Sequence, residues 1–298
     1  MEKKIRIITH SGNFHADEIL AVAALQILIK DAPHEVIRTR DADVIRAADY
    51  VVDVGGIYDA ATNRFDHHQQ GGAGMRENGI PYSAFGLVWK HYGEAICGSK
   101  QVAHAIDEQI GYPVDMGDNG HDYYKLIRQD TEPLIIQFVV AMFRPTWTEG
   151  LLHDERFFEL LTMMRRILLR TIKVETDKED GARFVEEAYA HADDKRIVIL
   201  DHVYPWHDVL AGHSEPLYIV KPKSVGTNWE VECVRDNPYG FKNRKDLPLK
   251  WAGHLEGDEK LAQITGVQDV VFCHNMRYVA VTKSKEGAVK LAQIAADA

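Results

Sequence analysis

The sequence predicts an α/β protein, in which a mostly parallel-sheet N-terminal domain precedes a smaller, strand-rich α/β C-terminal domain. Three observations predict this fold class. Short β-branched stretches alternate with helical patterns in the first half of the chain, as in βαβ units. A long helical pattern with an apolar stripe covers residues 154–192, and strand-like stretches dominate after it. We therefore expect two domains, 1–190 and 191–298, which agrees with a length of 298 residues.

Composition favours a soluble protein of a reducing compartment, and we expect a cytoplasmic location. Cys97, Cys233 and Cys273 are far apart and odd in number, which favours neither a disulfide framework nor a thiolate zinc site. We expect no signal peptide, because a strand-like stretch begins directly after Lys4. No apolar run reaches membrane-spanning length. The net charge of −10 disfavours a non-specific binder of long duplexes, but not a short anionic substrate.

The first part of the chain has the pattern of alternating strands and helices. We expect strands at 4–9, 35–38 and 50–53, and helices at 17–30 and 41–48. The first helix is apolar on more than one side, which is typical of a helix that other elements cover. In parallel sheets, sites form beyond the carboxyl ends of the strands. The polar stretches His10 to Asp17, Asp53, and Asp66 to His68 all fall at such ends.

The later elements follow from the same patterns. Glycine and polar residues at 69–80 predict a loop, which is either a lid over a site or a plain surface loop. We expect a turn with two acids at 114–120. The apolar stripe of 154–192 indicates core, inter-domain or dimer packing. The remaining expected elements are helices at 82–93, 99–110, 257–264 and 285–296, and strands at 196–200, 217–220, 229–234, 269–272 and 278–282.

Four stretches contain residue types that suit a metal site. The most distinctive is Phe65-Asp66-His67-His68-Gln69, because one of two adjacent histidines can ligate a cation while the other reaches a substrate oxygen. The others are Thr9-His10-Ser11-Gly12-Asn13-Phe14-His15-Ala16-Asp17-Glu18, Val51-Val52-Asp53-Val54-Gly55-Gly56 and Asp115-Met116-Gly117-Asp118-Asn119-Gly120. Each alone has an ordinary explanation as a turn, a helix start or a strand-end acid. Their combination in one domain favours a functional site.

Six residues supply three imidazoles and three carboxylates: His10, His15, Asp17, Asp53, His67 and Asp118. A single zinc ion needs only three or four ligands, so six suit two divalent ions that share a carboxylate. Mixed nitrogen and oxygen ligands favour Mn²⁺, with Mg²⁺ as the alternative. Two ions about 3.5–4 Å apart can activate water and clamp a phosphoryl group. His68 can then contact the phosphate or protonate the leaving oxygen, and Asp66 can orient an imidazole.

These motifs resemble those of the DHH phosphoesterase superfamily, named for its Asp-His-His. The closer resemblance is to its melanocyte-proliferating-gene type of metal-dependent hydrolase. It rests on Thr9-His10-x-Gly12-x-Phe14-His15-x-Asp17-Glu18, Asp53-Val54-Gly55-Gly56-x-Tyr58-Asp59, Arg64-Phe65-Asp66-His67-His68-Gln69 and Asp115-x-x-Asp118-Asn119-Gly120. Pro205-Trp206, Phe241-x-x-Arg244-x-x-Leu247-Pro248 and Trp251-x-Gly253 are similar to its C-terminal half, so the resemblance covers nearly the whole chain.

The resemblance implies a parallel-sheet catalytic domain, a C-terminal substrate-binding domain, and manganese-type phosphoesterase chemistry, with 3′–5′ exonuclease activity in some members. By position it makes His10, His15, Asp17 and His67 metal ligands, Asp53 the acid that bridges two ions, and His68 the phosphate contact. Asp118 matches the last acid, with Asp115 as a competing candidate. Phe272-Cys273-His274 resembles a substrate-contacting segment.

We therefore expect a two-metal phosphodiesterase that acts as a 3′–5′ exonuclease on short RNA or DNA. The alternatives are a pyrophosphatase or cyclic-dinucleotide or nucleotide phosphohydrolase with the same metals, and a non-catalytic metal- or nucleotide-binding protein. Residues 221–250 carry seven basic and four acidic side chains, which indicates an anion-facing strip or a solvated loop. Arg244 and His274 are the expected substrate contacts. We expect no membrane partner, and the apolar helical stripe is compatible with a homodimer.

Overall fold

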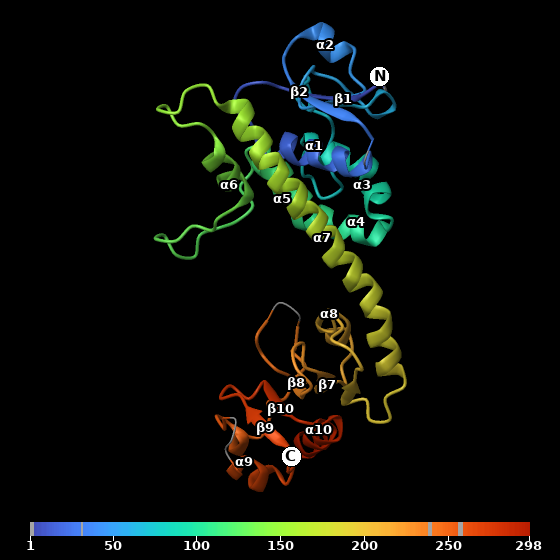
Figure 1. Cartoon of the computed structure of the whole chain (residues 1–298), viewed down its shortest axis with the longest axis vertical. Coiled ribbons are helices and arrows are strands. Elements are labelled where there is room, and N and C mark those ends of the chain that lie inside the picture. Colours follow the sequence, from blue (N-terminus) through green and yellow to red (C-terminus); the bar gives the residue numbers. More distant parts are fainter. Residues whose placement is uncertain (1–2, 31, 238–239, 256–258) are drawn as a thin grey trace. The chain divides into compact units, whose positions relative to one another are not determined.

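The computed structural model describes residues 3–30, 32–237, 240–255 and 259–298 of the chain (Figure 1). The chain forms two compact units, Met1–Thr176 and Asp177–Ala298. The long helix α7 (His153–Ala190) begins in the first unit and ends in the second. The sequence predicts a catalytic role for residues 1–190 and a substrate-binding role for residues 191–298, and both roles stay predictions.

A five-stranded sheet in the order β2-β1-β3-β5-β4 forms the centre of the first unit. Its strands are β1 (Ile5–Thr9), β2 (His34–Arg38), β3 (Tyr50–Val52), β4 (Tyr58–Asp59) and β5 (Arg64–Phe65). All neighbours pair in parallel except β4, which runs antiparallel to β5. The predicted α/β class with a mostly parallel first sheet is confirmed. Because β1, β3 and β5 are adjacent and parallel, the residues that follow them gather at one edge of the sheet.

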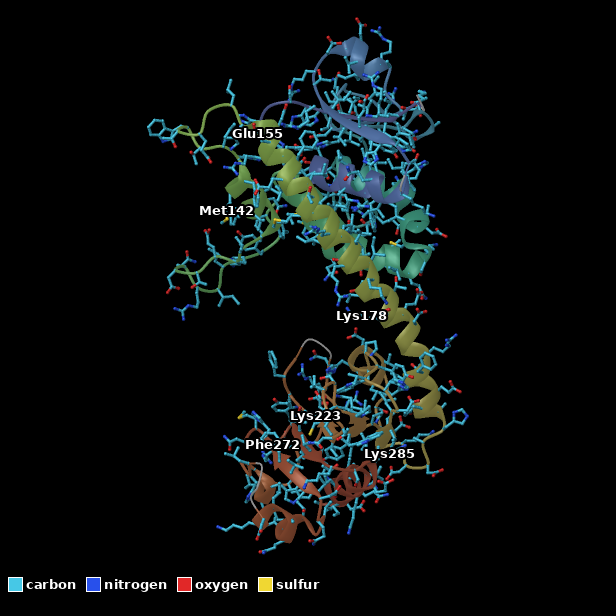
Figure 2. All side chains as sticks on the ribbon, in the orientation of Figure 1. Met142, Glu155, Lys178, Lys223, Phe272 and Lys285 are labelled. Atoms are coloured by element: carbon cyan, nitrogen blue, oxygen red, sulfur yellow. The ribbon has the colours of Figure 1, made fainter. Side chains whose placement is uncertain are left out.

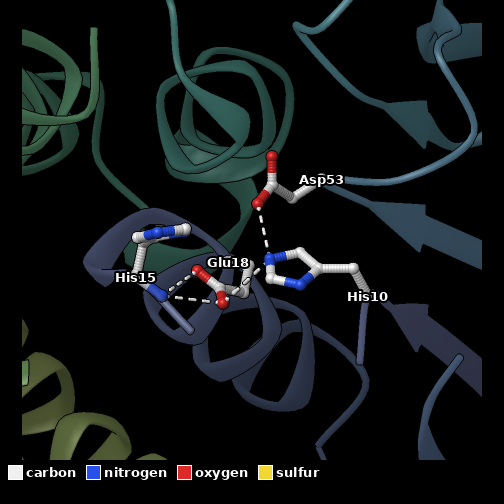
Figure 3. A group of neighbouring side chains, drawn as sticks. All are labelled: His10, His15, Glu18 and Asp53. Carbon is white, nitrogen blue, oxygen red and sulfur yellow. Dashed lines mark hydrogen bonds and ion pairs between the residues drawn. The ribbon is translucent and has the colours of Figure 1, made fainter. Parts of the chain in front are cut away.

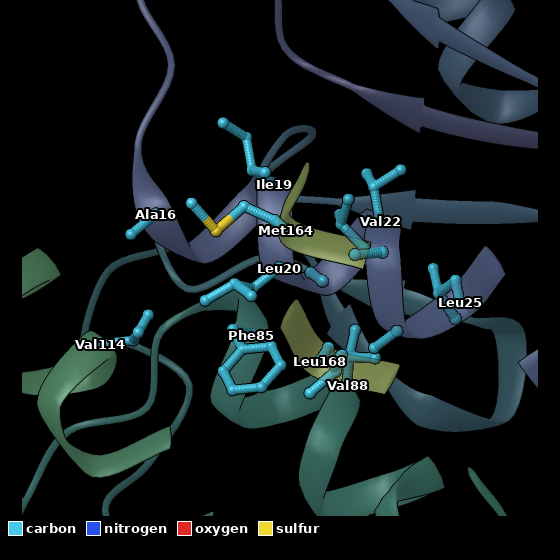
Figure 4. Close-up of a cluster of buried hydrophobic side chains, with 14 of the residues drawn as sticks. Ala16, Ile19, Leu20, Val22, Leu25, Phe85, Val88, Val114, Met164 and Leu168 are labelled. Carbon is cyan, nitrogen blue, oxygen red and sulfur yellow. The ribbon is translucent and has the colours of Figure 1, made fainter. Parts of the chain in front are cut away.

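Helices pack around this sheet and build the apolar core of the unit. They are α1 (Ala16–Leu28), α2 (Ala42–Arg46), α3 (Ala84–Cys97), α4 (Lys100–Ile106), α5 (Tyr112–Asp118), α6 (Ile136–Phe143) and the first part of α7. As its composition predicts, α1 is buried on most sides. Leu20 of α1, Phe85 of α3 and Met164 of α7 belong to one core cluster (Figure 4). Full burial of one such side chain contributes about 1.5–3 kcal/mol, so this core fixes α1 firmly beside the sheet.

The prediction of a turn at residues 114–120 is wrong, because most of these residues are helical. Helix α4 continues through a short π-helical turn, Asp107–Gly111, into α5, which ends at Asp118. Pro113 lies in the first turn of α5, directly after the π-helical turn. Only the residues after Asp118 leave the helix, with Gly120 at φ 70°. The acidic pair therefore lies on a helix, and Asp118 stands at a helix end rather than at a strand end.

The second unit contains a five-stranded sheet in the order β6-β7-β8-β10-β9, in which only β6 and β7 pair in parallel. Its elements are β6 (Ile197–Ile199), α8 (His207–Ala211), β7 (Tyr218–Pro222), β8 (Trp229–Cys233), α9 (Glu259–Thr265), β9 (Val270–Cys273), β10 (Val279–Thr282) and α10 (Lys285–Asp297). All five expected strands are present. The start of the helix expected at 257–264 lies outside the described residues. Within the described ranges, no helix is both long and apolar enough to cross a membrane.

Candidate metal centre

Three adjacent parallel strands deliver polar side chains to one edge of the first sheet. His10 follows β1, Asp53 follows β3, and the run from Asp66 to His68 follows β5. Nε2 of His10 lies 3.2 Å from Oδ2 of Asp53, and Nε2 of His67 lies 3.4 Å from Oδ1 of Asp53. The backbone of Asp53 is in the left-handed region at φ 57°, which is uncommon outside glycine. Such strained residues cluster at functional sites, where the surrounding structure holds them in place.

The beginning of α1 adds a second set of ligand-type residues. The backbone N–H of His15, the N-cap residue, donates to both carboxylate oxygens of Glu18 at 2.8 Å. Oε1 of Glu18 also lies 3.2 Å from Nε2 of His10, so Glu18 joins His10, His15 and Asp53 in one cluster (Figure 3). Glu18 is fully buried, although it was not among the expected ligands. The available signal was its position at the third residue after His15, where a glutamate caps the helix and faces its N-terminus.

Asp17 and Asp118 complete the group around His67. Nε2 of His67 lies 3.1 Å from Oδ2 of Asp118 and 3.8 Å from Oδ2 of Asp17. Asp17 is fully buried, and its Oδ2 accepts a hydrogen bond from the Ala84 N–H at 3.3 Å. Together with His15, the two carboxylates offer ligand atoms within 4.8 Å of one another. The fold thus brings together all six residues expected as ligands: His10, His15, Asp17, Asp53, His67 and Asp118.

Asp115, the competing candidate, is engaged elsewhere. Its Oδ1 accepts hydrogen bonds from the Ser83 N–H at 3.1 Å and the Ser83 hydroxyl at 2.6 Å, and its Oδ2 accepts one from Arg76 Nε at 2.8 Å. Arg76 also pairs with Asp107, and it ties the glycine-rich loop 69–80 to the helices. Both oxygens of Asp115 are therefore occupied, so the geometry favours Asp118 over Asp115 as a ligand. A lid function of the loop stays a prediction.

The two adjacent histidines have different surroundings. His67 is largely buried in the cluster, whereas 61% of the His68 side chain is exposed. Nδ1 of His68 donates to Oδ1 of Asp66 at 2.8 Å and lies 3.3 Å from Oδ1 of Asp53. Asp66 is buried, and its Oδ2 accepts a hydrogen bond from the Gly56 N–H at 2.5 Å. This arrangement matches the expectation that Asp66 orients an imidazole, and the catalytic roles of both residues stay predictions.

The close carboxylates and imidazoles strongly perturb one another. Burial alone would lower the pKa of His10, but its contacts with Asp53 and Glu18 outweigh burial and raise it to about 10. For His67, contacts with Asp118 and Asp53 likewise outweigh burial and raise the pKa to about 10. Burial would raise the pKa of Asp53, yet its histidine partners lower it to about 2. Burial and the neighbouring carboxylates raise the pKa of Asp17 well above its usual value.

These residues fit divalent cations. Their ligand atoms form three groups within 4.8 Å, which are His10, His15, Glu18 and Asp53; Asp53, His67 and His68; and His15, Asp17 and Asp118. Asp17 Oδ1, Asp53 Oδ1 and His67 Nε2 are buried and make no hydrogen bond to any described residue. Buried polar atoms without a partner are rare, and several carboxylates packed together repel one another. Cations would satisfy both the lone pairs and the negative charge.

A cavity of about 530 Å³ opens beside this centre. His15, His67, His68 and Asp118 line it on the side of the cluster, and the last turns of α6 line it with Arg144. The exposed histidine and the ligand-type residues therefore face the same space.

The expected substrate contacts of the second unit have structural partners. The guanidinium of Arg244 donates to the backbone oxygens of Pro216 at 3.0 Å and Ala211 at 2.9 Å. His274 is half-buried, and its Nδ1 accepts a hydrogen bond from the Met276 N–H at 3.0 Å. Neither observation tests substrate binding, so both assignments stay predictions.

The MYG1_exonuc family model, described as an uncharacterised protein family (UPF0160), matches residues 6–296. This chain belongs to the MYG1 exonuclease family. It is 29% identical over 323 residues to a MYG1 protein of Schizosaccharomyces pombe, covering 100% of this chain and 99% of the relative. Identity is 28% over 325 residues to the MYG1 exonuclease of Homo sapiens, covering 97% of this chain and 85% of the relative. A MYG1 protein of Dictyostelium discoideum is 29% identical over 319 residues.

Membership of the MYG1 family confirms the resemblance found in the sequence motifs. It also confirms the prediction of a hydrolytic enzyme, because family members carry the name exonuclease. The largely buried cluster of histidines and carboxylates has ligand types and spacing that could hold a metal ion.

Proposed function

We propose that this chain is a phosphodiesterase that removes nucleotides from the 3′ end of short RNA or DNA with two divalent cations. Mn²⁺ is the favoured ion and Mg²⁺ the alternative. One observation carries the proposal: Asp53 belongs to two of the three ligand groups, and so does His15. A carboxylate common to two groups suits a pair of ions that share a ligand. The human relative's name, MYG1 exonuclease, supports a nucleic-acid substrate.

We assign the steps of the reaction to the cations and to individual residues of the chain. Two cations at this site would supply water activation and neutralise phosphate charge. Asp53 holds the centre together, since it contacts both His10 and His67. His68 is exposed at the cavity and is oriented by Asp66, so it can give a proton to the leaving oxygen of the substrate.

A hydrolysis screen tests this proposal. Purified protein with Mn²⁺ is incubated with 5′- and 3′-labelled oligoribonucleotides and oligodeoxyribonucleotides of two to twelve nucleotides, with pyrophosphate and cyclic dinucleotides in parallel reactions. Stepwise shortening from the 3′ end, abolished by a chelator, is the expected result. Hydrolysis of pyrophosphate or cyclic dinucleotides alone would replace the exonuclease with the corresponding phosphohydrolase. Absence of any hydrolysis, together with retained metal, would favour a binding protein.

A cytoplasmic location and a homodimer complete the proposal. Cys97, Cys233 and Cys273 form no disulfide in the part of the chain that the structure describes, which is consistent with a reducing compartment. On the first unit, Met142 of α6 is 70% exposed (Figure 2), and Phe158 and Ile167 of α7 are each about 40% exposed. A homodimer would cover apolar side chains of this kind. Light scattering at micromolar concentration should give twice the chain mass, and a monomer would contradict the dimer.

A further inference from the structure

Arg144 places a permanent positive charge on the cavity beside the metal centre. It is the C-cap residue of α6 and lines the cavity of about 530 Å³ together with His15, His67 and Asp118. Its Nε donates to the backbone oxygen of Phe14 at 2.8 Å. Since Phe14 directly precedes His15, this bond holds the guanidinium next to the loop that carries the metal-ligand residues.

The outer nitrogens of Arg144 are uncommitted. Within the described part of the chain, the bond to Phe14 is the side chain's one hydrogen bond, and no carboxylate pairs with it. Other polar side chains on the same wall are occupied, because Gln137 and Asn119 donate their amides to backbone carbonyls. Of the described residues that line the cavity, Arg144 is the one with a guanidinium or ammonium group. Two N–H-bearing nitrogens are therefore left for a ligand.

A second arginine, Arg38, also bonds to the loop before α1, but its charge is paired. Arg38 donates to the backbone oxygen of Gly12 at 2.6 Å and pairs with Asp154 at 2.6 Å, and its guanidinium lies over the ring of Phe157. Arg38 thus already holds the same loop, with its charge neutralised by a carboxylate. In contrast, Arg144 keeps its charge unpaired beside carboxylates that two cations would neutralise.

We infer that Arg144 forms an anion subsite, which binds a non-bridging phosphate oxygen of the nucleotide at the metal centre. The inference rests on the proposed function, since it specifies how that site holds a phosphate. A guanidinium can offer two parallel N–H bonds to a phosphate, which an ammonium cannot match in geometry. The bond from Nε to Phe14 orients the group before the ligand arrives, so little conformational entropy is lost on binding.

Measuring the affinity for a nucleotide product tests phosphate binding by Arg144 without any catalytic step. We propose to measure the affinity of the Mn²⁺-loaded full chain for adenosine 5′-monophosphate and for adenosine by calorimetry. Arg144→Gln removes the charge but keeps an amide that can donate to Phe14. The control is Arg156→Gln, which removes an arginine that pairs with Glu149 and Glu159 outside the cavity. Arg144→Gln should weaken binding of the monophosphate about 10- to 100-fold, as for loss of a charge-assisted hydrogen bond.

The Arg144→Gln variant should keep the adenosine affinity, the Mn²⁺ content and the unfolding temperature of the unaltered protein. The Arg144→Lys variant should bind the monophosphate more tightly than Arg144→Gln but more weakly than the unaltered protein. Equal losses for adenosine and its monophosphate, or loss of Mn²⁺, would overturn the subsite and make Arg144 a positioning residue. Unchanged monophosphate binding, or no binding by the unaltered protein, would overturn it as well. Arg144-dependent binding without hydrolysis of any oligonucleotide would instead contradict the proposed function and leave the subsite standing.

Discussion

Oδ1 of Asp66 accepts a hydrogen bond from Nδ1 of His68 at 2.8 Å. A carboxylate can only accept, so the Nδ1 of His68 carries the hydrogen, and its Nε2 remains for another partner. Asp66 is itself fixed by the Gly56 N–H. His67 and His68 both line the cavity, but His67 is largely buried whereas His68 is mostly exposed.

The first prediction separates a proton donor from a metal ligand. His68→Ala should retain most bound metal but lose turnover on the order of 10²-fold, as for removal of a general acid. Asp53→Ala should lose metal, because Asp53 contacts both His10 and His67. Metal content by mass spectrometry and single-turnover rates check both variants. Equal loss of metal in the two variants would show that His68 is a ligand too.

The second prediction distinguishes the two acids of α5. Asp118→Asn should weaken metal binding with little effect on stability, since its carboxylate faces His67. Asp115→Asn should retain the metal but destabilise the fold by about 3 kcal/mol, because it breaks the buried pair with Arg76. Urea unfolding and a Mn²⁺ titration of each variant are the measurements. Loss of metal in Asp115→Asn at unchanged stability would reverse the assignment.

The third prediction concerns the pH dependence of the metal-free protein. The pKa of His10 and of His67 is about 10 in the fold, against a usual value of 6.5. The folded state then keeps protons that the unfolded chain releases above pH 6.5, so stability is full below that pH and falls as pH rises towards 10. The Tm of chelator-treated protein should therefore fall between pH 6.5 and 8.5. A Tm that rises over this window would contradict the protonated cluster.

The affinity for Mn²⁺ should change in the opposite sense. Metal-ligating imidazoles must be neutral, so binding displaces their protons and becomes tighter as pH rises. Calorimetry in buffers of different ionisation enthalpy counts the released protons. If Mn²⁺ binding releases no protons, His10 and His67 are not protonated in the metal-free protein, which would contradict this prediction.

The fourth prediction concerns Arg244 in the second unit. Because its guanidinium donates to two backbone carbonyls, Arg244→Ala leaves both without that partner and should cost about 1–3 kcal/mol of stability. His274→Ala should instead raise the KM for oligonucleotides at unchanged Tm. The matched comparison is a small chromogenic phosphodiester, whose hydrolysis should be nearly unaffected by His274→Ala. A stable Arg244→Ala protein with a raised oligonucleotide KM would make Arg244 a substrate contact.

The sequence predicted which polar residues gather at the candidate site better than it predicted the partners of those residues. His10, Asp53 and His67 follow short β-branched strands, and parallel pairing alone gathers such strand ends. Asp118 was expected in a turn, because Asp-Asn-Gly is a turn signal that also occurs where a helix ends. Local patterns do not report contacts between distant residues, so the bond between Arg76 and Asp115, 39 residues apart, could not be foreseen. The bond from Arg144 to Phe14 spans 130 residues, and no spacing rule indicates it.

The number of cations per chain tests the two-metal centre most directly. Chelator-treated protein is titrated with Mn²⁺ and followed by equilibrium dialysis with metal analysis, with Asp53→Ala as the matched variant. We predict saturation at two Mn²⁺ per chain for the unaltered protein, because its ligand atoms form separate groups that share Asp53 and His15. Saturation at one ion, or no binding, would contradict the proposed centre.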